Sequence, residues 1–212
     1  MRSPLAESRR EALLEAMLPE VPFDGWSRAT LRRAARRLGM TVGEALALFP
    51  RGPADLVAGF SRCADRRMLD RVETLPLAPL SVPERIALAI GTRLEIVEPW
   101  RDAVRRALTV LALPQHAPLA ARLVYETVDG VWYAAGDSAS DFSFYTKRLT
   151  LAAIYGAVVL YWLDDRSEGF ADTRAFLDRR LGDAARVGRA RRDLETVVGR
   201  LPNPLRALRP LR

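Results

Sequence analysis

The sequence predicts an all-α protein of about nine or ten helices. Apolar residues recur every three or four positions along most of the chain, and the alternation of apolar and polar residues that marks a strand is hard to find. The chain has 212 residues, of which 49% are hydrophobic and 28% charged. This composition is typical of a soluble globular protein and excludes a disordered or collagen-like chain.

Proline and glycine mark the limits of the first four helices. We expect a first helix at about 5–18, ended by Pro19, and two short helices separated by Gly39. A fourth helix begins at Pro53 and reaches the end of the N-terminal unit, which we place at residues 1–75.

The C-terminal part is predicted to be a helical bundle over residues 76–186. After a proline-rich turn we expect helices at about 83–98, 100–112, 116–135, 141–164 and 170–186, then an amphipathic helix from 187. From Leu149 onward the fourth of these is apolar on every face, which indicates burial on all sides. Its uncharged run ends at Leu163 and is shorter than the roughly 20 residues that span a bilayer.

The positive charge is carried by arginine and is unevenly distributed. The chain has 33 basic and 26 acidic residues, and Lys147 is its one lysine. Such a surplus first suggests nucleic acid. However, the largest excess lies in residues 181–212, with 8 basic and 3 acidic residues. There a narrow apolar stripe faces arginines, which is typical of a helix on an anionic membrane surface. The expected membrane-binding residues are Arg189, Arg192, Leu194, Val197, Val198 and Leu201.

Residues suited to catalysis are scarce. His116 is the single histidine, which excludes two-histidine metal sites, and it is expected in a loop or at a helix start. Cys63 cannot form an internal disulfide and is interpreted as a small core residue. Asp164 and Asp165 are expected in a turn at a helix end. We therefore expect a non-enzymatic binding protein without metal or cofactor.

The N-terminal unit resembles the DNA-binding domain of TetR-type regulators over residues 9–56. The resemblance rests on the packing positions of two helices around a Gly39 turn, namely Leu31, Ala34, Ala35, Leu38, Met40, Val42 and Phe49. It implies a TetR-like helical bundle with a helix-turn-helix-like unit.

The second helix of this unit lacks the residues that read DNA. A recognition helix needs polar or basic side chains on its outer face. Here the corresponding residues are Val42, Glu44, Ala45, Leu46, Ala47 and Leu48. Five arginines before them could touch a phosphate backbone nonspecifically, but a solvated helix face is the favoured interpretation: Arg28, Arg32, Arg33, Arg36 and Arg37. We do not expect nucleic-acid binding, and a ligand-responsive TetR-type transcription regulator is kept as the alternative.

A second resemblance extends over roughly residues 8–200. It is carried by Asp137-Ser138-Ala139-Ser140-Asp141-Phe142-Ser143-Phe144-Tyr145-Thr146-Lys147-Arg148, continuing to Asp164-Asp165-Arg166-Ser167 and 172–177. These segments resemble the accessory lipid-binding proteins of ubiquinone biosynthesis, which share the TetR-like fold. The resemblance implies a non-enzymatic protein that binds isoprenoid lipids, including ubiquinone precursors. It also implies that the protein presents them to the di-iron demethoxyubiquinone hydroxylase.

The same resemblance places a partner-binding patch on the predicted helix at 141–164. Helical spacing puts most of its residues on one face, and the expected patch is Phe144, Tyr145, Lys147, Arg148, Leu151 and Tyr155. Members of the family often have Trp where this chain has Phe144. One face can pack inward while the other meets a partner, or both faces can be core and dimer interface.

The lipid pocket is predicted between the C-terminal helices, where bundles usually hold ligands. Its expected lining residues are Leu88, Ile90, Leu94, Leu119, Leu123, Val131 and Leu149. The chain begins without the apolar run of a signal peptide, so a cytoplasmic protein is expected, peripheral to the inner membrane and forming a homodimer.

Overall fold

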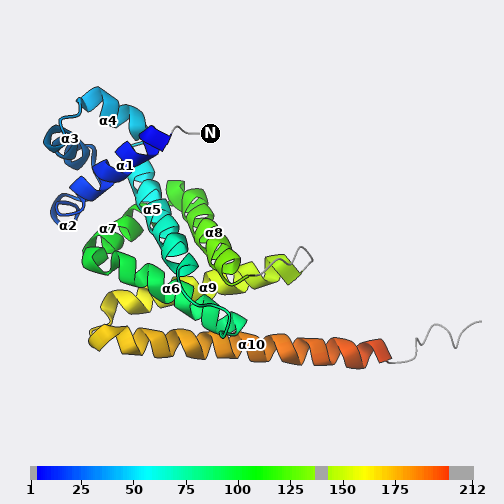
Figure 1. Ribbon diagram of the computed structural model, residues 1–212. Helices are drawn as coiled ribbons and strands as arrows, with labels where there is room; N and C mark the ends of the chain where they lie inside the picture. Colours follow the sequence, from blue (N-terminus) through cyan, green and yellow to red (C-terminus); the bar gives the residue numbers. More distant parts are fainter. Residues whose placement is uncertain (1–3, 137–142, 201–212) are drawn as a thin grey trace, which may run out of the picture.

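The computed structural model describes residues 4–136 and 143–200, except for the side chains of 143–144 and 188–200. Within these ranges the chain forms ten α-helices and three short 3₁₀ helices, and no strand. The predicted all-α class is therefore confirmed. The helices, shown in Figure 1, are α1 (Pro4–Met17), α2 (Val21–Asp24), α3 (Arg28–Arg37), α4 (Val42–Leu48), α5 (Pro53–Glu73), α6 (Val82–Val97), α7 (Arg101–Leu111), α8 (Ala117–Ala134), α9 (Ser143–Asp164) and α10 (Ala171–Arg200).

Short polar residues begin α3 and α4 in the N-terminal unit. Ser27 accepts a hydrogen bond from the backbone of Thr30 at the start of α3, and Thr41 forms a reciprocal capping box with Glu44 at the start of α4. Between the two helices Gly39 has a φ of +66°, a left-handed conformation that glycine adopts at little cost. The predicted turn at Gly39 is thus confirmed.

Two predicted boundaries differ from the structure. The helices expected at 170–186 and from 187 are one continuous helix, α10, which runs along one side of the molecule and extends beyond the packed body (Figure 1). The sequence offered no proline to divide them, and a glycine inside a helix costs only about 1 kcal/mol. Near the N-terminus, the short helix α2 follows the first helix and was not predicted; Pro22 lies in its first turn, where the missing N–H is tolerated.

Helix α5 lies between two hydrophobic clusters. Leu56 and Val57 in its N-terminal half belong to a cluster with residues of α1, α3, α4 and α7. Met68 and Val72 in its C-terminal half belong to a second cluster, with residues of α6, α8, α9 and α10. The predicted unit boundary after residue 75 follows the end of this helix. Helix α5 is therefore shared by both parts of the fold.

A buried tryptophan attaches the N-terminal unit to the bundle. The indole Nε1 of Trp26 donates a hydrogen bond to the carbonyl of Ala103 in α7 at 3.0 Å, and its ring lies 5.0 Å from the ring of Phe60. Because both ends of this side chain are engaged, α3 and α7 are held in a fixed relation.

The turn between α9 and α10 is built on Asp165. Its carboxylate is buried, which opposes ionisation, but hydrogen bonds from Ser167 and Thr173 outweigh that cost and lower its pKa to about 2. Arg101 donates to the Asp165 carbonyl at 2.6 Å and fastens the turn to the start of α7. The prediction of a turn at Asp164 and Asp165 is confirmed. None of the described helices has the length and apolar character needed to cross a membrane.

Candidate functional site

A cavity of about 290 Å³ lies between α5, α6, α7, α8 and α9. We call it the central cavity. Its wall is mostly aliphatic and aromatic, with Val57, Phe60, Leu94, Val97, Val104, Ala107, Leu108, Leu111, Ala120, Leu123, Val124, Gly156, Val159, Leu160 and Trp162 as the lining residues that carry no charge or hydroxyl. Apolar cavities of this kind between helices suit a hydrophobic ligand.

Two of the seven residues expected to bind lipid line the central cavity, Leu94 and Leu123. Ile90 and Val131 are buried in the adjoining hydrophobic cluster, and Leu119 packs at the edge of the N-terminal cluster. Leu88 is partly buried and lines neither cavity described here. Leu149 departs most from the predicted position in the pocket, because it is 74% exposed and lies on the outer face of α9.

Sequence reasoning missed the contributions of α5 and α7 to the cavity. Val57 and Phe60 come from α5, and Val104, Leu108 and Leu111 come from α7. The apolar stripe of α7 was visible in the sequence, but a stripe shows only which face is covered. Whether the covering is tight or leaves a cavity depends on how five helices meet.

Four polar residues share the otherwise apolar wall: Ser61, Arg93, Thr127 and Tyr155. Together with Asp65, which lies behind them, we call them the Arg93 cluster. Arg93 donates from Nε to Asp65 at 2.7 Å and from Nη2 to Ser61 at 3.1 Å. Thr127 donates to the same carboxylate at 3.0 Å. The cluster thus joins α5, α6 and α8.

The ionisation of the Arg93 cluster follows from its burial. Arg93 is 7% exposed, and although burial opposes its charge, attraction to the facing Tyr155 and Asp65 raises its pKa. Burial also raises the pKa of Tyr155, against the opposing effect of Arg93. At neutral pH the guanidinium is therefore charged and the phenol keeps its proton.

A second cavity of about 590 Å³ lies beneath α10, between α6, α8 and α9. Lys147 and Leu151, two of the residues expected to bind a partner, line it. The ammonium of Lys147 lies 5.5 Å from the ring of Trp132 on α8. Lys147 and Leu151 therefore lie on the side of α9 that faces α8 and α10.

Helix α9 turns a different face outward from the one expected to bind a partner. Arg148, Leu151 and Tyr155 are buried, and Arg148 donates to Asp129 at 2.8 Å. In contrast, Tyr145 is 72% exposed. The side chain of Phe144 lies outside the described residues. Because α9 is apolar all round, spacing alone could divide its faces but could not tell which of them packs inward.

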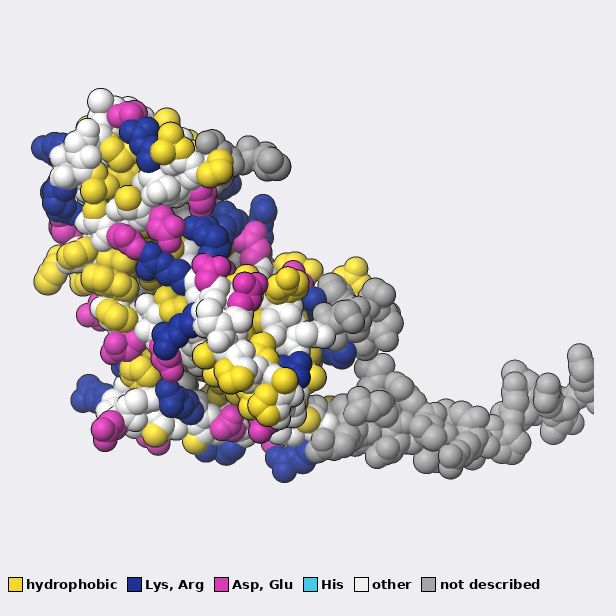
Figure 2. Space-filling view, viewed as in Figure 1, with side chains coloured by type: hydrophobic (Ala, Val, Ile, Leu, Met, Phe, Trp, Pro, Cys, Tyr) yellow, Lys and Arg dark blue, Asp and Glu magenta, His cyan; other side chains and the backbone are white. Residues whose placement is uncertain are grey.

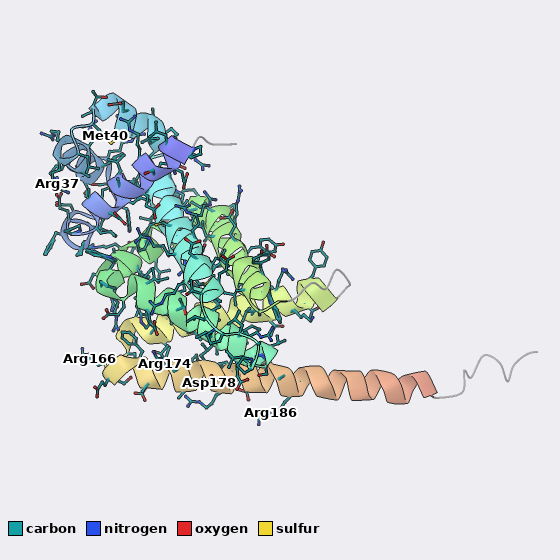
Figure 3. The ribbon with its side chains drawn as sticks, in the orientation of Figure 1. Arg37, Met40, Arg166, Arg174, Asp178 and Arg186 are labelled. Carbon is teal, nitrogen blue, oxygen red and sulfur yellow. The ribbon has the colours of Figure 1, made fainter. Side chains whose placement is uncertain are left out.

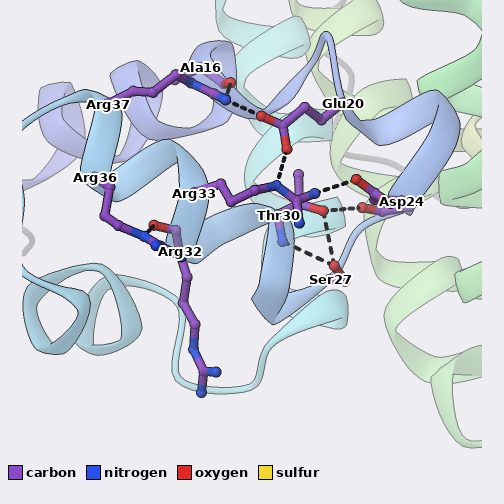
Figure 4. A network of polar contacts seen from close by, with 10 residues as sticks. Ala16, Glu20, Asp24, Ser27, Thr30, Arg32, Arg33, Arg36 and Arg37 are labelled. Carbon is purple, nitrogen blue, oxygen red and sulfur yellow. Dashed lines mark hydrogen bonds and ion pairs between the residues drawn. The ribbon is translucent and has the colours of Figure 1, made fainter.

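Two of the five arginines of α3, Arg33 and Arg37, form ion pairs with acidic residues of the same unit. Figure 4 shows Arg33 bound to Glu20 and Asp24, and Arg37 bound to Glu20 and to the carbonyl of Ala16. Hydrogen bonds from Arg37 and Arg33 lower the pKa of Glu20 and keep it charged. These two guanidinium groups are therefore occupied within the protein.

The exposed face of α4 carries no basic side chain. Its outward residues include Val42 and Ala47, and its one charged residue, Glu44, is held by Thr41 and by an ion pair with Arg9 at 2.9 Å. Hydrogen bonds from Thr41 and Arg9 lower the pKa of Glu44 to about 2, so its carboxylate is charged at neutral pH. A phosphate approaching this face of α4 would therefore meet a negative side chain. Figure 2 shows acidic and basic side chains intermixed over the visible face.

The remaining candidates for chemistry have structural roles. Burial and a hydrogen bond to Glu11 raise the pKa of Cys63 to about 12, so its thiol is a poor nucleophile. Nδ1 of His116 lies 2.8 Å from the carbonyl of Val110, at the start of α8. Both predictions, a core cysteine and a helix-start histidine, are confirmed. In the part of the chain that the structure describes, no group of three His, Cys, Asp or Glu residues is arranged to hold a metal ion.

The expected membrane-binding side chains lie beyond the described ones. Arg189, Arg192, Leu194, Val197 and Val198 belong to the part of α10 whose side chains are not described, and Leu201 follows the last described residue. Before them, Figure 3 shows Arg174, Asp178 and Arg186 in succession along α10.

The arrangement of helices defines a TetR-like class of fold. The chain is similar to a TetR transcriptional regulator from Nitrosomonas europaea, with a TM-score of 0.68 and 26% sequence identity over 84% of this chain and 98% of that one. The predicted TetR-like architecture is confirmed.

Within this fold class the chain is similar to the COQ9 proteins. Residues 117–188 match the COQ9 family model. The mitochondrial ubiquinone biosynthesis protein COQ9 of Homo sapiens is 32% identical over 90% of this chain, and that of Drosophila melanogaster is 32% identical over 84%. The resemblance that the sequence motifs indicated is thereby confirmed. The chain spans 62% of the length of the human protein and 56% of the fly protein.

Proposed function

We propose that this protein is a non-enzymatic lipid-binding protein of ubiquinone biosynthesis. The observation that carries the proposal is the central cavity, whose apolar wall is suited to an isoprenoid chain. The similarity to COQ9 proteins, which are named for ubiquinone biosynthesis, supports the choice of pathway. The bound lipids are then isoprenoid quinones and their precursors.

Transcriptional regulation, the alternative, is not proposed. The similar regulator from Nitrosomonas europaea supports a common architecture. However, Arg33 and Arg37 are engaged with acidic residues, and α4 presents Glu44 in place of a base-reading side chain.

Gly156 allows a direct test of the central cavity. It lines the cavity, and a Cβ added to it meets no atom within 4 Å. Gly156→Leu therefore places an isobutyl group in the cavity while the helix is kept. We expect binding of a farnesyl-substituted benzoquinone, measured by native mass spectrometry, to weaken at least about ten-fold, or roughly 1.4 kcal/mol.

Gly156→Ala is the matched control for this substitution. It removes the same glycine but leaves most of the cavity open, so binding should be retained, and the helix should gain up to about 1 kcal/mol of stability. Equal binding by the leucine variant and the unaltered protein would show that the lipid occupies another site and would contradict the proposal.

We further propose that the exposed start of α9 contacts the demethoxyubiquinone hydroxylase. Tyr145 is the described aromatic side chain of the expected patch that faces outward, and aromatic residues of this kind supply much of the binding energy at interfaces. Leu149, one turn further, extends the same exposed edge. Buried members of the expected patch, such as Leu151, would position this edge without touching the hydroxylase.

For the partner contact we predict that Tyr145→Ala weakens the affinity for the hydroxylase about ten-fold, as loss of an interface anchor does. Surface-immobilised hydroxylase from the same source provides the measurement. Phe23→Ala removes an exposed aromatic ring from α2, which lies far from the start of α9 (Figure 1), and this variant should bind as the unaltered protein does. Identical affinities for all three proteins would refute the assignment of this patch.

A homodimer is proposed through the outer face of α9 beyond Tyr145. Ala153, Ala157 and Leu160 are exposed at helical spacing, and small residues allow a second helix to approach closely. This face is continuous with Tyr161, whose ring stacks on Phe176 at 4.7 Å. The second copy would cover an apolar stripe that otherwise faces water.

We propose that the protein is peripheral to the inner face of the membrane and docks through the end of α10. The support is the sequence of residues 188–201, where arginines oppose an apolar stripe. Deletion of residues 188–212 should abolish flotation with phosphatidylglycerol vesicles, because each lost arginine contributes about 1 kcal/mol near an anionic surface.

Charge reversal at Arg189 and Arg192 tests the same membrane role with a smaller change than the deletion. It should reduce flotation at low salt and have less effect at high salt, since screening weakens the attraction for the unaltered protein too. If the truncated protein floats as well as the full chain, the membrane role of this segment is wrong.

A further inference from the structure

The Arg93 cluster is the single described interruption in the apolar wall of the central cavity. Four of its members, Ser61, Arg93, Thr127 and Tyr155, line the cavity from α5, α6, α8 and α9. A pure hydrocarbon would gain nothing from these groups, and burying polar groups carries a cost. The composition of the wall therefore fits an amphipathic ligand with one polar end.

The hydrogen bonds within the Arg93 cluster do not use all the N–H donors of Arg93. A guanidinium has five N–H donors, and Arg93 uses Nε for Asp65 and Nη2 for Ser61. Its Nη1 makes no hydrogen bond to any described residue. The Asp65 carboxylate already accepts from Arg93 and from Thr127. What the cluster lacks is an acceptor, and an oxygen atom of a ligand would supply it.

The net charge of the cluster selects among oxygen-bearing ligands. Arg93 and Asp65 form a buried pair with no net charge, and their side chains are only 9% and 12% exposed. Adding a phosphate to this pair would bury an uncompensated negative charge, which costs several kcal/mol. A neutral head with carbonyl or ether oxygens accepts hydrogen bonds without that cost.

We propose that the Arg93 cluster binds the oxygen atoms of a neutral oxygenated ring, such as a benzoquinone, at the head of an isoprenoid lipid in the central cavity. This inference rests on the proposed lipid-binding function and assigns the polar end of the same site. Arg93 donates to a ring oxygen, the aromatic ring of Tyr155 lies 5.5 Å from the guanidinium, and the isoprenoid chain extends along the apolar wall.

Three probes with the same tail test the inference on the full-length protein. They are farnesyl-benzoquinone, the hydrocarbon farnesene and farnesyl diphosphate, and native mass spectrometry gives the relative affinities. Because a hydrogen bond to a charged group contributes about ten-fold or more in affinity, we expect the quinone to bind at least ten times more tightly than farnesene. The diphosphate should bind more weakly than the quinone.

The double variant Asp65→Leu/Arg93→Met removes the ion pair without leaving either charge unpaired. It should lose the preference for the quinone while still binding farnesene. Ser61→Ala frees the Nη2 donor of Arg93 and is expected to fold normally, so it decides the question if the double variant fails to fold. The freed donor should strengthen the preference for the quinone over farnesene. Unchanged affinities for all three probes would contradict a guanidinium contact with the ligand.

Thr92→Val is the matched control, because Thr92 is a buried polar neighbour of Arg93 that does not line the cavity. Its probe preference should equal that of the unaltered protein. An unchanged preference in the double variant, or tighter binding of the diphosphate, would overturn the inference while leaving lipid binding intact. If the unaltered protein binds none of the probes, the proposed function itself fails.

Discussion

The buried ion pair between Arg93 and Asp65 is the interaction on which the arrangement of the bundle depends. It joins α6 to α5, and Thr127 and Tyr155 bring α8 and α9 to the same point. Neither charge could stay buried without the other, because removing one partner of such a pair costs about 3–5 kcal/mol. Four helices must therefore meet here, and the apolar surfaces that flank this point enclose the central cavity.

Pairing of charges also holds several arginines of the helix-turn-helix-like unit within the protein. Arg33 and Arg37 are held by Glu20, and Arg66 and Arg67 are held by the acidic residues of α1. In this unit arginine connects helices to one another. The N-terminal unit keeps the scaffold of a TetR-like fold, and these four arginines form ion pairs within it.

Much of the fold followed from local patterns, whereas most of the site did not. Gly39 acts within a few positions of the chain, so the sequence predicts the turn that it makes. The cavity depends on how distant helices meet, so only Leu94 and Leu123 of its wall were predicted. Helix α9 is apolar on all sides, and no periodicity could show that Leu149 faces outward while Tyr155 faces inward. The long-range contact of Arg93 with Asp65, 28 positions apart, left no local signal.

The central claim is that lipid occupies the cavity between α5 and α9. Methyl-labelled protein observed by NMR during titration with farnesyl-benzoquinone tests it most directly. The account predicts chemical-shift changes at the methyl groups of Leu94, Leu108 and Leu123, which line the cavity, and none at Leu13 in the N-terminal cluster. Changes confined to Ile154 and Leu181, which line the second cavity beneath α10, would contradict it.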